Sequence, residues 1–329
     1  MDRTVLGSIG VWASPLAVWV AAVGGIAPHA GSAEIDVVAR RVTAAQAPTI
    51  DGKPDAAWDE APLTRFTLSE GSQGSVEVTL RALRTDTHLY LLVRWPDKTQ
   101  SLNRFYEFTG SGWRPARGRE DRLNIAWDIG GSTKGFATQG CSVLCHKTEG
   151  VMRTPAAGER IDLWYWMAQR TNPVGTADDW VMGHEPAPVD GARSGRRPDA
   201  STGGPFESNW DEAARQPRST FRTGLRGGPV LLRPDAVPIP AAVRFKAGDR
   251  LPREVLGSPS GPRAGIEARG LWERGQWTVE LRRALATGDE HDVQFTGPGP
   301  YHCAVSIHDD AEKDEHAQMG RDVLRLRLE

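Results

Sequence analysis

Cysteine is scarce in this chain, with only three among 329 residues: Cys141, Cys145 and Cys303. An odd number does not form a complete disulfide framework, so the sequence is not that of a small disulfide-stapled domain. Charge of one sign is not in excess either, because 40 Lys and Arg residues face 42 Asp and Glu residues. Nucleic-acid binding needs clustered cations, so we expect no nucleic acid as a partner.

Long apolar runs are missing after the first 33 residues, so no later segment is long enough to span a membrane. The N-terminus carries Arg3, then an apolar stretch that is densest from Leu16 to Ala27, then small residues up to Ala33. This pattern is typical of an export signal, and we expect cleavage after Ala33. An uncleaved anchor is the alternative, although a proline and two glycines interrupt the stretch. We therefore predict a signal peptide over 1–33, an exported, periplasmic protein, and no membrane span after cleavage.

Sustained helical periodicity is absent, whereas turn-forming residues are abundant, with 36 Gly and 23 Pro. Short segments with alternating or dense apolar residues predict β-strands instead. These segments are 76–83, 89–95, 123–129, 162–167, 265–272, 277–283, 301–308 and 323–328. The apolar pattern disappears between about 183 and 240, which predicts an insertion of long surface loops. We expect an all-β fold, an antiparallel β-sandwich that forms one domain over 34–329 with this loop-rich insertion.

The sharpest local signal for chemistry is a C-x3-C-H arrangement of Cys141, Cys145 and His146. Two thiols can form thioethers with haem vinyl groups, and the adjacent imidazole can then bind the iron. The usual attachment motif has two residues between the cysteines, whereas this one has three. The residues alone leave two other interpretations open. One is a Cys141–Cys145 disulfide beside a surface histidine, and the other is three ligands of a zinc site.

The residues around this motif can supply what a haem requires, namely an apolar slot, flat walls and a second iron ligand. Trp164 and Trp166 share one face of a predicted strand, where they either wall a porphyrin or pack in the core. Arg153 and Arg170 can pair with the haem propionates, because guanidinium matches carboxylate in a bidentate way. The candidates for the second iron ligand are Met167, which is our first choice, and then Met319, His316 and Met152.

Catalytic motifs are missing, because we find no nucleophile elbow, phosphate loop or zinc-protease motif. Asp178 and Asp179 are adjacent and would point apart on a strand, so they make a poor acid–base pair. An acidic run near the C-terminus forms either a solvated turn or a calcium site. It consists of Asp309, Asp310, Glu312, Asp314 and Glu315. We expect no enzyme activity from this chain by itself, and any substrate turnover would belong to a partner.

Together these motifs resemble the cytochrome c-552/DMSO reductase-like haem-binding domain family, which includes the γ subunit of ethylbenzene dehydrogenase. The matching segments are 49–52 with Trp58, 140–146, 152–154, 162–166, 170–175 with 178–179, and 308–310 with His316. The resemblance covers about 48–179 and 301–328. It implies a sandwich similar to a family-9 carbohydrate-binding module that holds one haem, b-type or c-type.

The resemblance also implies how the haem is held and what it does. In the γ subunits of molybdenum enzymes, Met and Lys hold the haem without covalent bonds, and here Met167 stands where a Lys would fit. The cysteine motif favours a c-type haem with His146 as the proximal ligand, while a b-type haem stays possible. We expect an electron carrier or electron-transfer subunit that exchanges electrons with a redox partner, either a molybdenum oxidoreductase or another cytochrome.

A binding module without redox chemistry is the alternative function. The Ile50-Asp51-Gly52 step with Trp58 also opens carbohydrate-binding sandwiches, in which exposed aromatic rings stack on sugars. A disulfide between Cys141 and Cys145 would then be structural.

Overall fold

The computed structural model describes residue 1 and residues 32–144, 151–189, 192–225, 227–311 and 315–329. The chain divides into two units, 1–31 and 32–329, and every described strand belongs to the second unit. Residues 2–31 lie outside the described residues, so the export signal stays a prediction. In the part of the chain that is described, no helix is long and apolar enough to cross a membrane.

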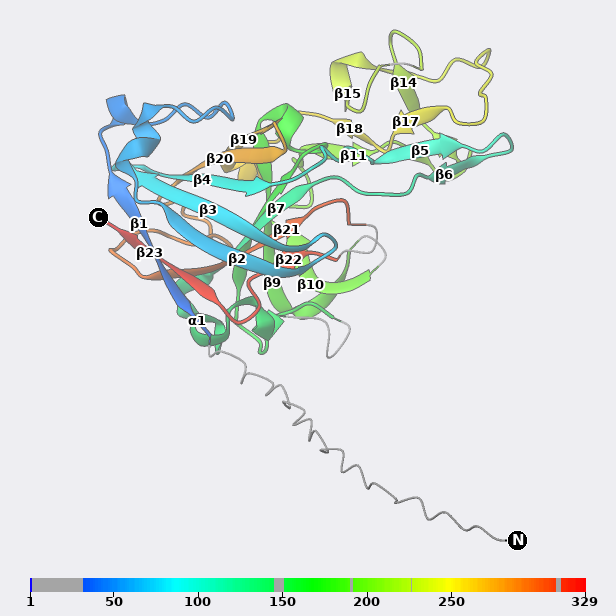
Figure 1. Ribbon diagram of the computed structural model, residues 1–329. Helices are drawn as coiled ribbons and strands as arrows, with labels where there is room; N and C mark the ends of the chain where they lie inside the picture. The colour runs from blue at the N-terminus through cyan, green and yellow to red at the C-terminus, as the bar shows by residue number, and fades with distance from the viewer. Residues whose placement is uncertain (2–31, 145–150, 190–191, 226, 312–314) are drawn as a thin grey trace. The chain divides into compact units, whose positions relative to one another are not determined.

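Thirteen strands form one large sheet, which is antiparallel except where β1 joins it (Figure 1). They are β1 (Glu34–Arg41), β2 (Thr64–Gly71), β3 (Gly74–Arg84), β4 (His88–Pro96), β7 (Arg122–Asp128), β8 (Ile161–Met167), β9 (Thr176–Val189), β10 (Ala192–Pro198), β19 (Ile266–Glu273), β20 (Gln276–Ala284), β21 (Tyr301–His308), β22 (Ala317–Gln318) and β23 (Val323–Leu328). All eight strands that the sequence predicts are among them.

The remaining elements are short. The strands are β5 (Phe105–Phe108), β6 (Trp113–Pro115), β11 (Phe206–Ser208), β12 (Trp210–Asp211), β13 (Gln216–Pro217), β14 (Ser219–Phe221), β15 (Leu231–Leu232), β16 (Ala236–Pro238), β17 (Arg250–Pro252) and β18 (Glu254–Leu256). One helical turn, α1 (Phe136–Gln139), precedes the 3-10 turn η4 (Gly140–Leu144). Other 3-10 turns are η1 (Ala44–Gln46), η2 (Ala56–Glu60), η3 (Ile129–Gly131), η5 (Asn172–Val174), η6 (Arg233–Asp235) and η7 (Gly261–Ala264).

The large sheet closes on itself, because pairing runs β21-β22-β2-β3-β4-β20-β19-β9-β8-β7 and returns from β7 to β21. Two sides of this ring pack face to face. Trp166 of β8 contacts Trp95 of β4 and Trp277 of β20, with ring centroids 6.1 and 4.9 Å apart. The main core therefore fills the space between β7, β8 and β21 on one side and β3, β4 and β20 on the other. The predicted all-β sandwich is confirmed.

Turn chemistry accounts for the hairpins. β19 and β20 are joined by two residues, Arg274 with φ 53° and Gly275 with φ 77°. Positive φ at both central residues is the geometry of the tight turn that suits the twist of antiparallel strands. The connected strands pair along their full length, from Ile266 opposite Arg283 to Glu273 opposite Gln276.

A second, smaller core covers the outer side of β3 and β4. Trp58 is 2% exposed and packs there with Ile50, Leu83 and Leu92. Its indole Nε1 donates to Glu280 Oε1 at 2.7 Å, and the other oxygen of Glu280 accepts from the backbone N–H of residues 51 and 52. The Ile-Asp-Gly and Trp motif thus fixes the first segment of the chain onto the sheet, which agrees with the expected burial of this indole.

The insertion between 183 and 240 differs from the expected loops. It contains the end of β9, β10 and six short strands, β11 to β16. Phe221 and Leu231 are buried there with Leu251 and Val255 in a third apolar cluster. Strands of two or three residues are too short to show alternation, which is why the sequence pattern predicts loops at this place.

Candidate functional site

Four directly opposed residues form a polar row on the side of the sheet opposite to Trp164 and Trp166. Gln318 on β22 pairs with Ser306 on β21, which pairs with Asn124 on β7, which pairs with Tyr165 on β8. Opposed residues point to the same side of a sheet. Asn124 Nδ2 donates to Ser306 Oγ at 3.2 Å, and Arg196 of β10 donates to the Tyr165 hydroxyl at 3.2 Å. We call this side of β22, β21, β7 and β8 the polar face.

The next row on the polar face carries His308, Arg122 and Met167, which are opposed on β21, β7 and β8. The His308 ring stacks on His316, with centroids 5.0 Å apart and planes 29° apart. Its Nδ1 lies 3.3 Å from Asn124 Nδ2. Burial, reinforced by the charge of Arg122 and of His316, lowers the pKa of His308 well below its usual value. This imidazole is therefore neutral at pH 7, the form that can bind a metal.

Arg122 is the buried cation of this face. Burial lowers its pKa to about 10, and its Nε and Nη2 atoms have no hydrogen-bond partner among the described residues. The closest carboxylate, Glu120, lies 3.9 Å from Nε, and its oxygens also serve Arg104 and Arg170. A buried guanidinium with unmade hydrogen bonds is costly unless an anion completes it. Arg122 therefore gives the polar face the capacity to bind an anionic group.

Cys141 lies at the end of the polar row. Its Sγ is 3.8 Å from Gln318 Oε1 and 3.5 Å from the carbonyl oxygen of Gly320. The preceding Gly140 has φ 53°, and a Cβ there would meet the carbonyl oxygen of Asp322 at 2.2 Å. Only glycine lets the chain approach this closely before the first thiol. Cys145 and His146 lie outside the described residues.

Met152 and Arg153 lie beside β10, at the end of the polar face that is away from Cys141. The carbonyl oxygen of Met152 accepts from the N–H of Gly195 and from the Ser194 hydroxyl. A Cβ on Gly195 would meet Arg153 Cβ at 2.9 Å. This close approach brings the residue pair that follows the cysteine motif to the strand that carries Arg196.

The other predicted site residues lie elsewhere. Trp164 and Trp166 are 1% and 0% exposed and point into the main core, where Trp164 packs on Trp127 at 5.3 Å. Met319 is 5% exposed in the same core. Arg170 is ion-paired with Glu120 and does not share the polar row.

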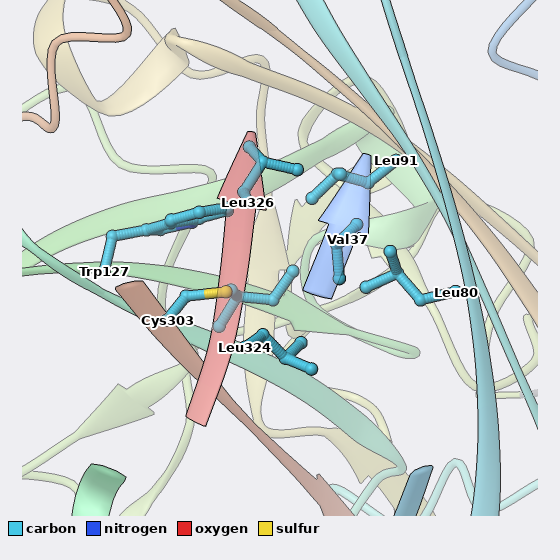
Figure 2. Close-up of a pocket in the computed structure, with 8 residues that line it drawn as sticks. Val37, Leu80, Leu91, Trp127, Cys303, Leu324 and Leu326 are labelled. Atoms are coloured by element: carbon cyan, nitrogen blue, oxygen red, sulfur yellow. The ribbon is translucent and has the colours of Figure 1, made fainter. Parts of the chain in front are cut away.

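A small apolar cavity opens within the core next to Cys303 (Figure 2). Its lining residues are Val37, Leu80, Leu91, Ile125, Trp127, Cys303, Leu324 and Leu326. Burial raises the pKa of the Cys303 thiol, so this sulfur stays protonated. The lining contains no histidine or methionine, and a protonated Cys303 thiol lacks the thiolate that binds haem iron.

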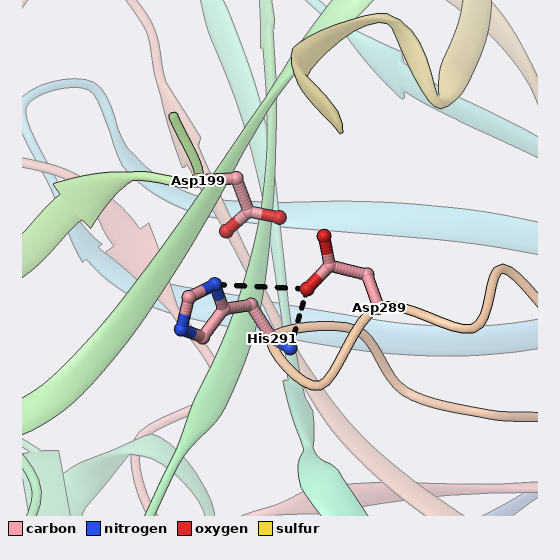
Figure 3. Close-up of side chains that lie close together, drawn as sticks. All are labelled: Asp199, Asp289 and His291. Carbon is pink, nitrogen blue, oxygen red and sulfur yellow. Dashed lines mark hydrogen bonds and ion pairs between the residues drawn. The ribbon is translucent and has the colours of Figure 1, made fainter. Parts of the chain in front are cut away.

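Two further acidic clusters lie beside arginine side chains. Asp162, Asp179 and Asp292 surround its guanidinium, which supplies their counter-charge. Asp199, Asp289 and His291, all half-buried, lie close together (Figure 3). His291 Nδ1 is 3.7 Å from Asp289 Oδ1, and Arg197 lies 3.3 Å from the other ring nitrogen. Protein cations thus accompany both clusters.

The sequence did not point to Arg122 and Asn124 as site residues. They alternate with Leu123 and Ile125 along β7, so one side of that strand is apolar and the other polar. Two polar residues that share the outer side of an otherwise buried strand are the signal that could have identified them.

Comparisons with known proteins cover solved structures, curated proteins and protein families. Among solved structures, a family-9 carbohydrate-binding module from Caldicellulosiruptor kristjanssonii in complex with glucose is 9% identical, with 89% of this chain and 96% of that chain covered and a TM-score of 0.33. A putative carbohydrate-binding protein from Bacteroides uniformis is 8% identical, with 90% and 100% covered and a TM-score of 0.36. The search of curated proteins found no match. The model of the ethylbenzene dehydrogenase family matches residues 39–319, most of the chain, and the protein therefore belongs to that family.

Proposed function

We propose that this chain is an exported haem protein that carries single electrons to or from a redox partner, and that its haem is bound on the polar face. One observation carries the proposal. The first thiol of the C-x3-C-H motif lies against Gln318, the end of the row that continues through Ser306, Asn124 and Tyr165. The first thiol of the motif and the stacked rings of His308 and His316 thus belong to one side of one sheet.

The described residues fit this group. A haem carries two carboxylates, and Arg122 is a buried guanidinium with two nitrogens that lack partners among the described residues. Arg196, which donates to Tyr165, adds a second cation on the same side. Paired guanidinium and carboxylate groups form strong charge-assisted hydrogen bonds. We assign to Arg122 and Arg196 the propionate role that the sequence suggests for Arg153 and Arg170.

The proposed iron ligands and haem anchors lie partly within and partly outside the described residues. Cys141 and Cys145 would hold the haem by thioethers, and His146 would be the proximal ligand. For the second ligand we favour His316, because its ring stacks on neutral His308 at the polar face. Met167 is the next candidate, since it is opposed to Arg122 on the same side.

When bound, the haem supplies a one-electron ferric and ferrous couple. The chain's own residues set its environment. Two imidazoles give a lower reduction potential than an imidazole with a thioether. Arg122 and Arg196 stabilise negative charge on the propionates, and Trp164 and Trp166 hold β8 rigidly from the core side.

The family supports the proposal of a redox partner. Its description names a dehydrogenase, an enzyme class that releases electrons. We propose that the chain passes such electrons between a catalytic subunit, for example a molybdenum oxidoreductase, and a second cytochrome. Catalysis of the substrate reaction would then belong to the partner. The export signal proposed for 1–33 would place this exchange in the periplasm.

The test is spectroscopic. The mature chain is expressed in an export-competent host with haem-maturation machinery, purified, and recorded as a reduced-minus-oxidised spectrum. We expect a Soret band, and haem staining retained on a denaturing gel. A colourless protein from cells supplied with haem would refute the proposal. Colour that is lost on denaturation would refute thioether attachment and leave a b-type haem.

Single variants separate the ligand candidates. His316→Ala should change the ferric spectrum and the reduction potential, whereas Met319→Leu should change neither, because Met319 lies in the main core. Loss of the methionine-type ferric band in Met167→Leu, with no change in His316→Ala, would overturn the choice of His316.

The carbohydrate-binding alternative lacks a platform in the described residues. Trp58 is 2% exposed, and the large apolar side chains that are exposed among these residues are Met1 and Leu63, neither of them aromatic. Stacking on a sugar needs an exposed ring, so the burial of Trp58 gives this function no support.

A further inference from the structure

Three aspartates meet at one end of the sandwich, outside the polar face. Asp97 follows β4 directly, Asp121 precedes β7 directly, and Asp309 follows β21 directly. One carboxylate oxygen from each residue lies within 4.8 Å of the other two. Because β7 and β21 pair from Arg122 opposite His308, Asp121 and Asp309 extend this pairing by one residue. Asp97 reaches them from the opposite layer.

The lack of a paired Lys or Arg among the described residues distinguishes this cluster from the other two, which also contain buried carboxylate oxygens without hydrogen-bond partners. Asp97 is 2% exposed and Asp121 is fully buried. Asp97 Oδ2 and Asp121 Oδ1 have no hydrogen-bond partner in the part of the chain that is described. Neither residue forms an ion pair with a described Lys or Arg, whereas Arg283 or Arg197 accompanies the other clusters. The cationic residue that acts on this cluster is Lys98, through Asp309.

The second oxygen of each buried carboxylate is fixed by donors. Asp121 Oδ2 accepts from the N–H of Ser101 at 2.7 Å and from Trp277 Nε1 at 3.0 Å. Asp97 Oδ1 accepts from the N–H of Thr99 at 2.9 Å. Each side chain is therefore held in place through one oxygen while the other is left without a donor. A bound cation would supply the missing partner of these two buried, oriented oxygens.

We propose that Asp97, Asp121 and Asp309 form a calcium site that ties β4 to β7 and β21 at this end of the sandwich. The donors are all carboxylate oxygens, which suit hard cations such as Ca²⁺ rather than zinc or copper. Ca²⁺ accepts ligand oxygens at about 2.3–2.6 Å in flexible geometry, so oxygens grouped within 4.8 Å can share one ion. The site does not depend on haem binding.

The electrostatics agree with this geometry. Burial, followed by repulsion from Asp97, raises the pKa of Asp121 to about 8. Burial also raises the pKa of Asp97 to about 7, with contributions from Asp309 and Asp310. Without a cation these carboxylates resist ionisation, and a divalent ion would relieve that resistance.

The test uses the full mature chain after treatment with a chelator. Terbium luminescence, excited through tryptophan, reports the site because the Trp277 indole contacts Asp121. We expect sensitised emission, displacement of terbium by Ca²⁺ with one ion bound, and a rise in melting temperature on adding Ca²⁺. Asp309→Asn, a half-buried position, should lower the Ca²⁺ affinity at least tenfold. Asp289→Asn, in the half-buried cluster with Asp199 and His291, is the matched control and should leave the affinity unchanged.

Several results would overturn the site. One is the absence of Ca²⁺ binding at millimolar concentration in calorimetry. Another is Ca²⁺ affinity that Asp309→Asn and Asp121→Asn leave intact but Asp289→Asn removes. Equal stabilisation by Mg²⁺ at the same concentration would overturn the calcium class. Because a misfolded variant would also lose binding, circular dichroism of each chelated variant must match that of the wild type before its affinity is compared.

Discussion

Replacing Arg283 with methionine tests how the core of this sandwich tolerates charge. The Arg283 side chain is completely buried, and its nitrogens lie 2.9 Å from Asp162, 2.9 Å from Asp179 and 2.5 Å from Asp292. Its guanidinium also lies over the ring of Trp164, 5.2 Å from the centroid. The substitution leaves three buried carboxylates without their cation.

The expected loss of stability is large. Removing one partner of a buried ion pair costs about 3–5 kcal/mol, and the lost cation–π contact adds roughly 1 kcal/mol. We therefore expect Arg283→Met to lose about 4–6 kcal/mol, or a drop of ~10–20 °C in melting temperature for a domain of this size. Arg282→Met is the control. Arg282 pairs with Glu267 at 2.7 Å with both side chains more than 40% exposed, so its loss should cost about 0–1 kcal/mol.

The loss should also depend on pH. Burial already raises the pKa of Asp162 to about 6 and that of Asp179 well above its usual value, despite Arg283. Without Arg283 these pKa values rise further above the unfolded value of about 3.9. Groups with a raised pKa stabilise the fold below the unfolded pKa and lose this contribution as pH rises through the folded pKa. Urea unfolding should therefore show a larger deficit at pH 8 than at pH 4.5. A deficit below about 1 kcal/mol, or one independent of pH, would refute the reasoning.

Three further predictions follow from packing and charge. Gly270→Ala places a Cβ 2.3 Å from the Trp166 ring, so unfolding should show a loss of about 1–3 kcal/mol, whereas Gly112→Ala, with no atom within 4 Å, should be near neutral. Trp58→Phe removes the 2.7 Å hydrogen bond to a buried Glu280 oxygen and should lower the free energy of unfolding by about 1.5–3 kcal/mol in the same assay. An unchanged free energy of unfolding would contradict the structural role of Trp58. Burial, with repulsion from neighbouring aspartates, raises the pKa of Asp199 to about 8, so this residue makes the protein less stable as pH rises from about 4 to 8. The melting temperature of Asp199→Asn should therefore fall less than that of the wild type over this range. Parallel curves of melting temperature against pH for the two proteins would contradict the raised pKa.

Much of the fold could be predicted because alternation and turn chemistry are local properties. β3 with β4 and β19 with β20 were predictable, since each hairpin combines a patterned segment with a short turn. β1 was not, because it pairs in parallel with β23, some 290 residues away in the chain. The short strands of the insertion were not predictable either, since they depend on a local apolar cluster rather than on their own pattern.

The candidate site was predictable in part. The sequence suggests Cys141 and His316 as candidates, and strand parity places Trp164 and Met167 on opposite sides of β8. It does not tell which side of β8 meets the core, because both sides carry large apolar residues. Nor does it identify Arg122, whose importance depends on burial and on missing partners that only the tertiary structure reveals.

The intact mass of the purified, denatured mature chain tests the central claim most directly. Haem held by Cys141 and Cys145 predicts the mass of the processed polypeptide plus one haem, with no signal for the bare chain in the coloured fraction. The mass of the bare chain, or that mass reduced by the two hydrogens of a disulfide, would contradict covalent attachment of haem beside the polar face.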